Sequence, residues 1–234
     1  MDKLYSICWN ITNKCNENCK FCYRKICNDN SLNENKKMFD NISKIKIDKI
    51  TFSGGEPLLY ENLFELASYV KQKNPQINLS ITTNAQLIDE NIFNKILNVF
   101  DWISFSIDSS NIDINNEIGR GKNHLPQILN LLEKFNGKIK IKINTVAMKY
   151  NIGDLENIYN LISKYDISRW KIFRFYSIRR GKENEKLFYL NDSESKLVED
   201  FVNKKQAENT KIKMHYNNFN EFTTSYFNIY PNGS

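Results

Sequence analysis

Three cysteines stand close together near the start of the chain, in the run Cys15-Asn-Glu-Asn-Cys19-Lys-Phe-Cys22. A cubane 4Fe–4S cluster normally takes four cysteine ligands, one for each iron. This run supplies three thiolates from one loop, so one iron would stay open to bind a molecule that reacts. Zinc more often takes pairs of CxxC or added histidines, and the chain has only two histidines. An odd count of five cysteines does not suit a disulfide framework. The sequence therefore predicts a 4Fe–4S cluster on this loop.

A second motif, Thr51-Phe-Ser-Gly-Gly-Glu-Pro57, follows the apolar-alternating stretch Ile45–Phe52. Glycines at the end of a strand let the backbone approach a ligand closely. Glu56 adds a carboxylate that can hold an ammonium group. Alone, this segment is also compatible with a tight turn into a helix that Pro57 starts. In the same chain as the cysteine run, it indicates a cofactor site much more specifically.

Together the two motifs strongly resemble the radical S-adenosylmethionine enzymes. The resemblance implies that the open iron binds the amino and carboxylate groups of S-adenosylmethionine. It also implies that Gly54, Gly55 and Glu56 line the methionine end of that cofactor. One electron, from a donor such as a flavodoxin or ferredoxin, would then cleave the sulfonium to a 5′-deoxyadenosyl radical. In such enzymes the protein supplies position and excludes water, while the cofactor carries the chemistry.

The length and charge of the chain limit the classes of protein that fit. With 234 residues, the chain is expected to be one α/β domain with a sizeable core. The net charge of +6 is moderate and suits anionic small ligands as readily as nucleic acid. Met1–Thr12 lacks the apolar core of a signal peptide, and no segment approaches the roughly 18 apolar residues of a membrane span. Clustered thiols without a secretion signal indicate a reducing cytosol. We therefore expect a cytoplasmic protein with no membrane and no direct nucleic-acid partner.

Strand-like and helix-like segments alternate along the chain. The expected strands are Tyr5–Ile11, Lys46–Phe52, Asn78–Thr83, Trp102–Ile107, Lys138–Ala147 and Trp170–Ile178, and the expected helices are Glu61–Lys73, Asp89–Phe100, His124–Phe135, Asp154–Ser163 and Ser193–Gln206. Six βα units imply a parallel sheet. The family resemblance sharpens this to a partial (βα)6 barrel with its site at the carboxyl ends of the strands. We expect a single domain over residues 1–234, with the barrel core in 1–190 and a C-terminal segment, 191–234, that covers the barrel mouth.

The two-residue period of strands shows which polar residues share a face. In Trp102–Asp108, two serines including Ser106 share a face with Asp108, as in a strand that lines a ligand cavity. A solvent-facing edge strand is the alternative. In the next strand, Asn144 lies on the face opposite the isoleucines.

Positive charge gathers in two later segments. Arg169 and Lys171 share one face of their strand, and the loop Gly119-Arg-Gly-Lys-Asn-His124 is rich in glycine and cations. A helix is expected to follow this loop, and helix N-terminal amides are a good place for phosphate. Arginine and lysine can hold a polyphosphate through charge-assisted hydrogen bonds. Surface cations are usually only solvated, so this interpretation requires that both segments converge on the barrel mouth.

A closer resemblance covers nearly the whole chain. The segments that carry it, in order, are Trp9–Asn16, Phe52–Pro57, Ser106–Ser109, Ile118–Gly121, Lys142–Thr145, Arg169–Phe173 and Ser225–Tyr226. They are similar to viperin and its microbial relatives, the viperin-like enzymes. The resemblance implies conversion of a ribonucleoside triphosphate to its 3′-deoxy-3′,4′-didehydro analogue. The adenosyl radical would take the 4′ hydrogen, the 3′ hydroxyl would leave as water, and an electron and a proton would complete the product. Such products terminate RNA chains and act in antiviral defence.

The same resemblance assigns roles to residues of this chain. The residues expected to hold the triphosphate are Arg120, Lys122, Arg169 and Lys171. Tyr226 would be the late hydrogen donor, although a strand aromatic packed on the core is also compatible with the sequence. Ser106 and Asn144 would contact the ribose of S-adenosylmethionine or of the nucleotide.

The chain departs from these relatives in two places, and two alternative functions stay open. It lacks the amphipathic helix that precedes the barrel in the animal enzyme, and it stops at Tyr230-Pro-Asn-Gly-Ser, a turn signal. Either this protein is shorter there, or the chain is truncated, which would put nucleotide affinity in doubt. One alternative is a radical enzyme acting on a peptide or a deazapurine precursor. A peptide-modifying enzyme would usually carry cysteines in a C-terminal extension, and none follows Cys27. The other is a non-catalytic iron–sulfur protein, which prefers four protein ligands.

Overall fold

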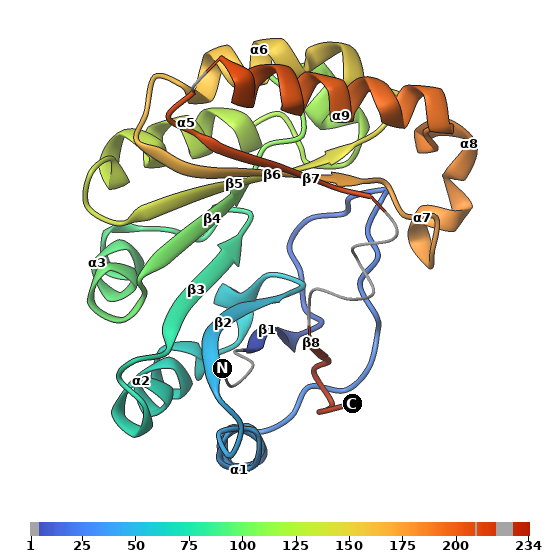
Figure 1. Cartoon of the computed structure of the whole chain (residues 1–234). Coiled ribbons are helices and arrows are strands. Elements are labelled where there is room, and N and C mark those ends of the chain that lie inside the picture. Colours follow the sequence, from blue (N-terminus) through green and yellow to red (C-terminus); the bar gives the residue numbers. More distant parts are fainter. Residues whose placement is uncertain (1–4, 209, 219–226) are drawn as a thin grey trace.

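The computed structural model describes residues 5–208, 210–218 and 227–234, which fold into one curved sheet covered by helices on its outer side (Figure 1). Its strands are β1 (Tyr5–Thr12), β2 (Ile47–Gly54), β3 (Asn78–Thr83), β4 (Trp102–Ser106), β5 (Lys140–Ala147), β6 (Ile167–Arg174), β7 (Lys213–Asn217) and β8 (Phe227–Ile229). The strand order is β7-β6-β5-β4-β3-β2-β1-β8, and every pair is parallel. The sheet curls into the expected partial barrel.

Helices connect successive strands across the outer face. They are α1 (Leu32–Ile42), α2 (Leu63–Lys73), α3 (Glu90–Val99), α4 (Ile112–Glu117), α5 (His124–Phe135), α6 (Leu155–Ile162), α7 (Arg180–Glu183), α8 (Glu185–Phe188) and α9 (Asp192–Ala207). Local sequence sets several of their boundaries. α3 begins after Asp89, whose side chain accepts a hydrogen bond from the Ile92 amide and so satisfies one free N–H of the first turn.

The partial barrel is confirmed, with additions that the sequence patterns did not reveal. β1 to β6 with their connecting helices form the six expected βα units, while β7 and β8 extend the two edges of the sheet. α1 was missed because its sequence is mostly polar, and β8 because it has only 3 residues. The last barrel strand, expected at Trp170–Ile178, lies at Ile167–Arg174. The expected turn near the end of the chain forms, because the Gly233 amide donates to the Tyr230 carbonyl at 2.8 Å.

The two faces of the sheet differ in polarity. On the outer face, Ile141, Ile143 and Trp170 are fully buried beneath the helices, and burying each such side chain contributes about 1.5–3 kcal/mol. On the inner face, the strand register places Ser106 beside Asn144, and Asn144 beside Lys171. The inner face therefore carries polar side chains within the curve of the sheet, beside apolar ones such as Val146 and Phe173.

The proposed division at residue 190 stays a prediction. α9 packs on the outer face, where Phe201 contacts Trp170 with ring centroids 5.9 Å apart, and β7 adds a further unit to the barrel. Near the other edge, Asn228 of β8 lines the cavity described below. Within the described residues, no helix has the length and apolar character needed to cross a bilayer.

Candidate active site

A cavity of about 230 Å³ lies on the inner side of the sheet, toward the carboxyl ends of the strands. Its walls come from the loop after β1, from strands β1 to β6 and β8, and from the loop that carries Arg120. The lining residues used below are Cys8, Cys15, Glu17, Cys19, Cys22, Gly54, Gly55, Thr83, Asn84, Ser106, Arg120, Lys142, Asn144 and Phe173. The cavity therefore lies where the barrel geometry led us to expect the site.

The three cysteines of the loop all line this cavity. None of the chain's cysteines is in a disulfide, and Cys19 is buried while Cys15 and Cys22 are partly exposed. Among the described residues, no group of three or more histidine, cysteine or acidic side chains is placed to hold a single metal ion. A cubane binds each cysteine through a different iron, so its thiolates surround the cluster rather than meet at one point. The donor set and its place on the cavity wall fit a 4Fe–4S cluster.

Burial also sets the protonation of these thiols. It raises the pKa of both the Cys15 and the Cys19 thiol, so the cluster-free chain holds protons on them at neutral pH. Metal binding requires thiolates and releases those protons.

The two glycines at the end of β2 allow a close approach, but the partner is the start of the cysteine loop. A Cβ on Gly54 would lie 2.3 Å from the Thr12 carbonyl oxygen, and one on Gly55 would lie 2.0 Å from the Lys14 carbonyl oxygen. The Gly55 amide donates to the Thr12 carbonyl at 2.7 Å. Both glycines also line the cavity. The glycines therefore pack against the start of the cysteine loop, and their expected contact with S-adenosylmethionine stays a prediction.

Glu56 lies behind the cavity wall. Glu56 is 1 % exposed. Its carboxylate accepts hydrogen bonds from the Thr83 hydroxyl at 2.8 Å, the Asn84 backbone N–H at 2.8 Å and the Leu58 backbone N–H at 3.1 Å. Burial raises its pKa to about 7, against the lowering effect of these donors. Thr83 and Asn84 line the cavity, whereas Glu56 is not among the lining residues. The structure thus shows Glu56 shaping the end of β3, and its expected contact with the cofactor stays a prediction.

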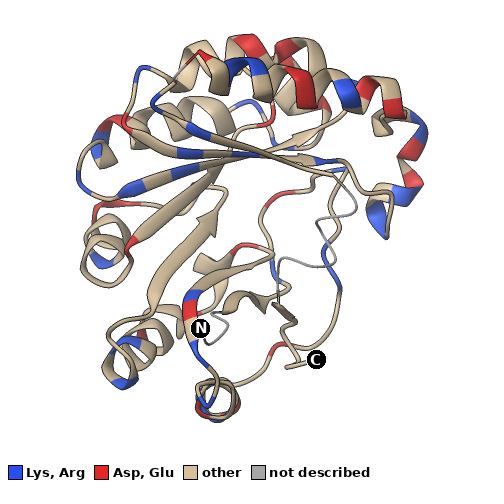
Figure 2. Cartoon of the chain, viewed as in Figure 1, with Lys and Arg blue, Asp and Glu red and all other residues tan. Residues whose placement is uncertain are grey.

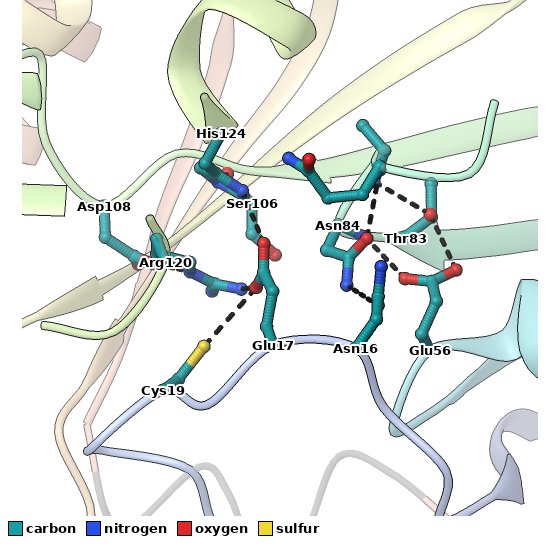
Figure 3. Close-up of polar contacts among 12 residues, drawn as sticks. Asn16, Glu17, Cys19, Glu56, Thr83, Asn84, Ser106, Asp108, Arg120 and His124 are labelled. Atoms are coloured by element: carbon teal, nitrogen blue, oxygen red, sulfur yellow. Dashed lines mark hydrogen bonds and ion pairs between the residues drawn. The ribbon is translucent and has the colours of Figure 1, made fainter. Parts of the chain in front are cut away.

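Arg120 lies between two carboxylates at the cavity wall (Figure 3). Its Nε donates to Asp108 Oδ2 and its Nη1 to Glu17 Oε2, both at 2.8 Å. The other oxygen of Glu17 lies 2.8 Å from Nδ1 of His124. Burial opposes ionisation of Glu17, but the hydrogen bond from His124 and the charge of Arg120 outweigh it and lower its pKa.

This arrangement alters the role expected for the loop from Gly119 to His124. Arg120 is already paired with carboxylates of this chain, and Lys122 is exposed and not among the cavity-lining residues. The loop packs against the cysteine loop. Phosphate binding by Arg120 and Lys122 stays a prediction that these positions do not favour.

A different group of cations lies on β2, β5 and β6, with Lys171 buried and Arg169 exposed; we call Lys49, Lys142, Arg169 and Lys171 the barrel cations. The Lys49 ammonium lies 4.6 Å from the centroid of the Trp102 ring, and the Arg169 guanidinium 5.8 Å from it. The Lys171 and Lys142 ammonium groups lie 5.1 Å and 6.0 Å from the Phe173 ring centroid. Figure 2 shows basic residues on the neighbouring strands β5 and β6. The structure therefore brings Arg169 and Lys171 together, as expected, and adds two lysines.

Like charge in this group shifts the lysine pKa values. Burial, followed by the charges of Lys171 and Lys49, lowers the pKa of Lys142 to about 7. Burial and the charge of Arg169 lower the pKa of Lys49 to about 8. A site that crowds cations in this way favours a polyanion, because a bound anion would relieve their repulsion.

Ser106 and Asn144 line the cavity, as the alternating faces predicted. Within the part of the chain that the structure describes, the buried Oδ1 of Asn144 and the buried hydroxyl of Ser104 have no hydrogen-bond partner. Buried polar atoms rarely stay unpaired, so these two atoms favour a polar ligand beside them. Tyr226, the expected hydrogen donor, lies outside the described residues.

Lys142 and Glu17 were not predicted as site residues, and they differ in the sequence signal that could have revealed them. Lys142 lies two positions before Asn144 in β5 and shares its face, so the two-residue period was a usable signal. Glu17 lies between two cysteines and gave no periodic signal, and its partner Arg120 is 103 positions away.

Comparison with known proteins places these features in a family. The model of the Radical SAM superfamily matches residues 9–162. The S-adenosylmethionine-dependent nucleotide dehydratase RSAD2 of Danio rerio is 32% identical over 178 residues, which are 72% of this chain and 49% of that protein. A nucleotide dehydratase of Selenomonas ruminantium is 29% identical over 185 residues, covering 73% of this chain and 65% of its own. The Fe-coproporphyrin III synthase of Methanosarcina barkeri is 30% identical over 190 residues, 78% of this chain and 47% of that protein.

The chain spans about half to two thirds of the length of these relatives. Among solved structures, Streptococcus suis SuiB bound to S-adenosylmethionine superposes with a TM-score of 0.80 at 17% identity, over 97% of this chain and 58% of that one. The enzyme anSMEcpe with bound AdoMet gives a TM-score of 0.68 at 19% identity, over 91% of this chain and 64% of that one. These structures share the fold.

Proposed function

This chain belongs to the radical S-adenosylmethionine superfamily, and we propose that it is a nucleotide dehydratase that converts a ribonucleoside triphosphate to its 3′-deoxy-3′,4′-didehydro analogue. Members of the superfamily use a 4Fe–4S cluster and S-adenosylmethionine. When bound, these groups supply hydrogen-atom abstraction from the substrate. The observation that carries the choice of substrate is the set of barrel cations, of which Lys142 lines the same cavity as the cysteines and Lys171 lies against the Phe173 ring of that cavity.

The cofactor end of the site is assigned to residues of the cavity wall. Cys15, Cys19 and Cys22 are proposed to hold the cluster, because they are the cysteines that one loop brings to the cavity. Gly54 and Gly55 are proposed to line S-adenosylmethionine, since both face the cavity from the neighbouring end of β2. Ser106 and Asn144 are proposed to bind hydroxyl groups of a ribose.

The substrate end is assigned to the barrel cations. A triphosphate carries several negative charges in a compact group, and four cations held by two aromatic rings can bind it through charge-assisted hydrogen bonds. Among the charges that act on Lys142, the neighbours are three other barrel cations and the Cys8 thiol, which burial keeps protonated by raising its pKa to about 11. A peptide substrate would leave this crowding of positive charge without a counterion.

Further roles follow from the same proposal. Tyr226 is proposed to give the hydrogen that completes the product, and the segment 191–234 to complete the mouth of the barrel through its last residues, of which Asn228 lines the cavity. An external electron donor of the flavodoxin or ferredoxin type would reduce the cluster. The thiolate ligands require a reducing compartment such as the cytoplasm. The expected products would terminate RNA chains, in keeping with antiviral defence.

A second candidate substrate is an anionic porphyrin. The relative from Methanosarcina barkeri is named a coproporphyrin synthase and is 30% identical, and porphyrin carboxylates would also pair with the barrel cations. Two of the compared relatives are named nucleotide dehydratases, which favours the triphosphate.

The test is an anaerobic assay of the reconstituted, chemically reduced protein with S-adenosylmethionine. Each of the four ribonucleoside triphosphates, the matching nucleosides and an anionic iron tetrapyrrole that is a precursor of iron coproporphyrin are supplied in parallel, and 5′-deoxyadenosine and new products are measured by mass spectrometry. We expect one or more triphosphates to raise 5′-deoxyadenosine release and to yield a product lighter by one water and carrying one new double bond. Equal stimulation by nucleosides, or a response to the tetrapyrrole alone, would overturn the assignment.

A further inference from the structure

A buried carboxylate in the middle of the cysteine loop fastens that loop to the segment between α4 and α5. We name Glu17, Asp108, Arg120 and His124 the Glu17 clasp. We propose that Glu17 and His124 are positioning residues, which hold the cysteine loop and the Arg120 guanidinium in place before any cluster binds. The inference rests on membership of the superfamily and not on the identity of the substrate.

Both oxygens of Glu17 are used within the clasp. The side chain is 5 % exposed and points from the loop between His124 and Arg120 (Figure 3). Oε2 accepts from Arg120 Nη1 and Oε1 faces His124 Nδ1, each at 2.8 Å. The second ring nitrogen of His124 lies 2.7 Å from the Ser106 carbonyl oxygen, which can only accept, so this nitrogen carries a proton. Glu17 therefore ties the loop to the end of β4 through His124 and to the cavity wall through Arg120.

The backbone of the cysteine loop is also in close contact with the backbone that follows α4. The Lys20 amide donates to the Ile118 carbonyl at 2.9 Å. Gly119 has a φ of +93°, and a Cβ at this position would lie 2.5 Å from the Asn18 carbonyl oxygen. Only glycine lets the two segments approach so closely. Side-chain and backbone contacts therefore both hold the two segments together. They place Cys19 between anchored residues on either side.

The clasp also sets the direction of Arg120. A guanidinium has five N–H donors in a fixed plane, and two of them bind carboxylates of Asp108 and Glu17. These two bonds fix the plane of the Arg120 guanidinium. Because Arg120 lines the cavity, its remaining N–H donors have one orientation there. Loss of the Glu17 charge in a glutamine would leave one acceptor oxygen for either Arg120 or His124, and an NH2 group would face the N–H donor of the other. Removing one partner of a buried ion pair is strongly destabilising, because the other charge stays buried.

The decisive variant is Glu17→Gln, which keeps the size of the side chain and removes its charge. The matched control is Glu117→Gln, an exposed carboxylate of the adjoining helix that binds Tyr150 and not the clasp. Three readouts apply: amide hydrogen exchange of Lys20 in the cluster-free protein, iron bound per chain after anaerobic reconstitution, and the change in the electron paramagnetic resonance signal of the reduced cluster when S-adenosylmethionine is added.

We expect Glu17→Gln to speed exchange of the Lys20 amide by about tenfold or more, with exchange in the core strands β4 and β5 unchanged. We also expect iron content and the spectral response to S-adenosylmethionine to fall, and Glu117→Gln to match the wild type in all three. His124→Gln removes only one arm of the clasp and keeps the Glu17–Arg120 ion pair, so its effects should be smaller and in the same direction. Wild-type Lys20 exchange in both variants would overturn the proposal. So would exchange that rises equally in β4 and β5, because the residues would then support the whole fold and not the loop.

Discussion

Replacement of Lys142 by methionine tests the substrate end of the site through two opposite effects. Methionine keeps most of the length of the side chain and removes the charge. At pH 7 we expect the variant to bind a ribonucleoside triphosphate more weakly, because a charge-assisted hydrogen bond contributes about 1.5–3 kcal/mol, which is about one to two decades in the dissociation constant. The ligand-free protein should become more stable, because a partly buried ammonium crowded by other cations is removed.

The pH dependence follows from the direction of the shifts. In the ligand-free protein the pKa of Lys142 is lowered to about 7 and that of Lys49 to about 8, and a bound polyanion raises both. Binding above pH 7 must therefore take up a proton, so affinity falls as pH rises, by about tenfold per unit where one lysine must be recharged. The stability of the folded, ligand-free protein changes with pH in the opposite direction to the affinity. The unfolded chain holds more protons than the folded one between the lowered pKa and the usual lysine value, so the stability of the ligand-free protein rises with pH across that range.

The assay is isothermal titration calorimetry with a triphosphate at pH 6.5, 7.5 and 8.5, in buffers of different ionisation enthalpy so that proton uptake is measured directly. Thermal unfolding of the ligand-free protein is recorded at each pH. The control is Lys149→Met just after β5, an exposed lysine that does not line the cavity and is not among the charges that act on Lys142 or Lys49. We expect Lys142→Met to flatten the pH dependence and to raise the unfolding temperature near pH 7, and Lys149→Met to do neither. Proton uptake that is equal in wild type and Lys142→Met would refute the reasoning.

Three further outcomes are expected. Cys15→Ala should lose the cluster, seen as iron content and visible absorption after anaerobic reconstitution, while Cys27→Ala should keep it; the reverse pattern would show that the ligands are wrongly assigned. Gly55→Val should lose iron as well as affinity for S-adenosylmethionine, because its Cβ would lie 2.0 Å from the Lys14 carbonyl oxygen of the cysteine loop, and full iron content would contradict this packing. Tyr226→Phe should keep 5′-deoxyadenosine release and lose most of the didehydro product, and a wild-type rate of product formation would mean that another residue donates the hydrogen.

The parts of the site that the sequence predicted are those that depend on neighbouring residues. The cysteine spacing places three thiolates on one loop, and the two glycines mark the end of β2, so both reach the cavity whatever the rest of the chain does. The alternation of strands and helices was enough to predict a parallel sheet, since parallel strands need crossover helices, and the family resemblance added the partial barrel. In β5 the period of two placed Asn144 on the inner face, and the same period places Lys142 there.

The residues whose roles changed are those whose partners come from distant parts of the chain. Arg120 lies in a loop rich in glycine and positive charge, which is typical of a phosphate site, but the fold brings Glu17 and Asp108 to it and pairs its charge internally. Glu56 is similar, because β3 supplies Thr83 and Asn84 as donors to its carboxylate. Charge and spacing in a sequence predict what a side chain can bind, whereas its actual partner depends on which elements pack beside it.

The most direct test of the central claim is transfer of hydrogen from the substrate. The reduced, cluster-loaded protein is incubated with S-adenosylmethionine and a ribonucleoside triphosphate that carries deuterium at the 4′ position, and 5′-deoxyadenosine is analysed by mass spectrometry. The account predicts that one deuterium appears in 5′-deoxyadenosine and that its release depends on the triphosphate group. Release of unlabelled 5′-deoxyadenosine at the same rate with and without the nucleotide would contradict it.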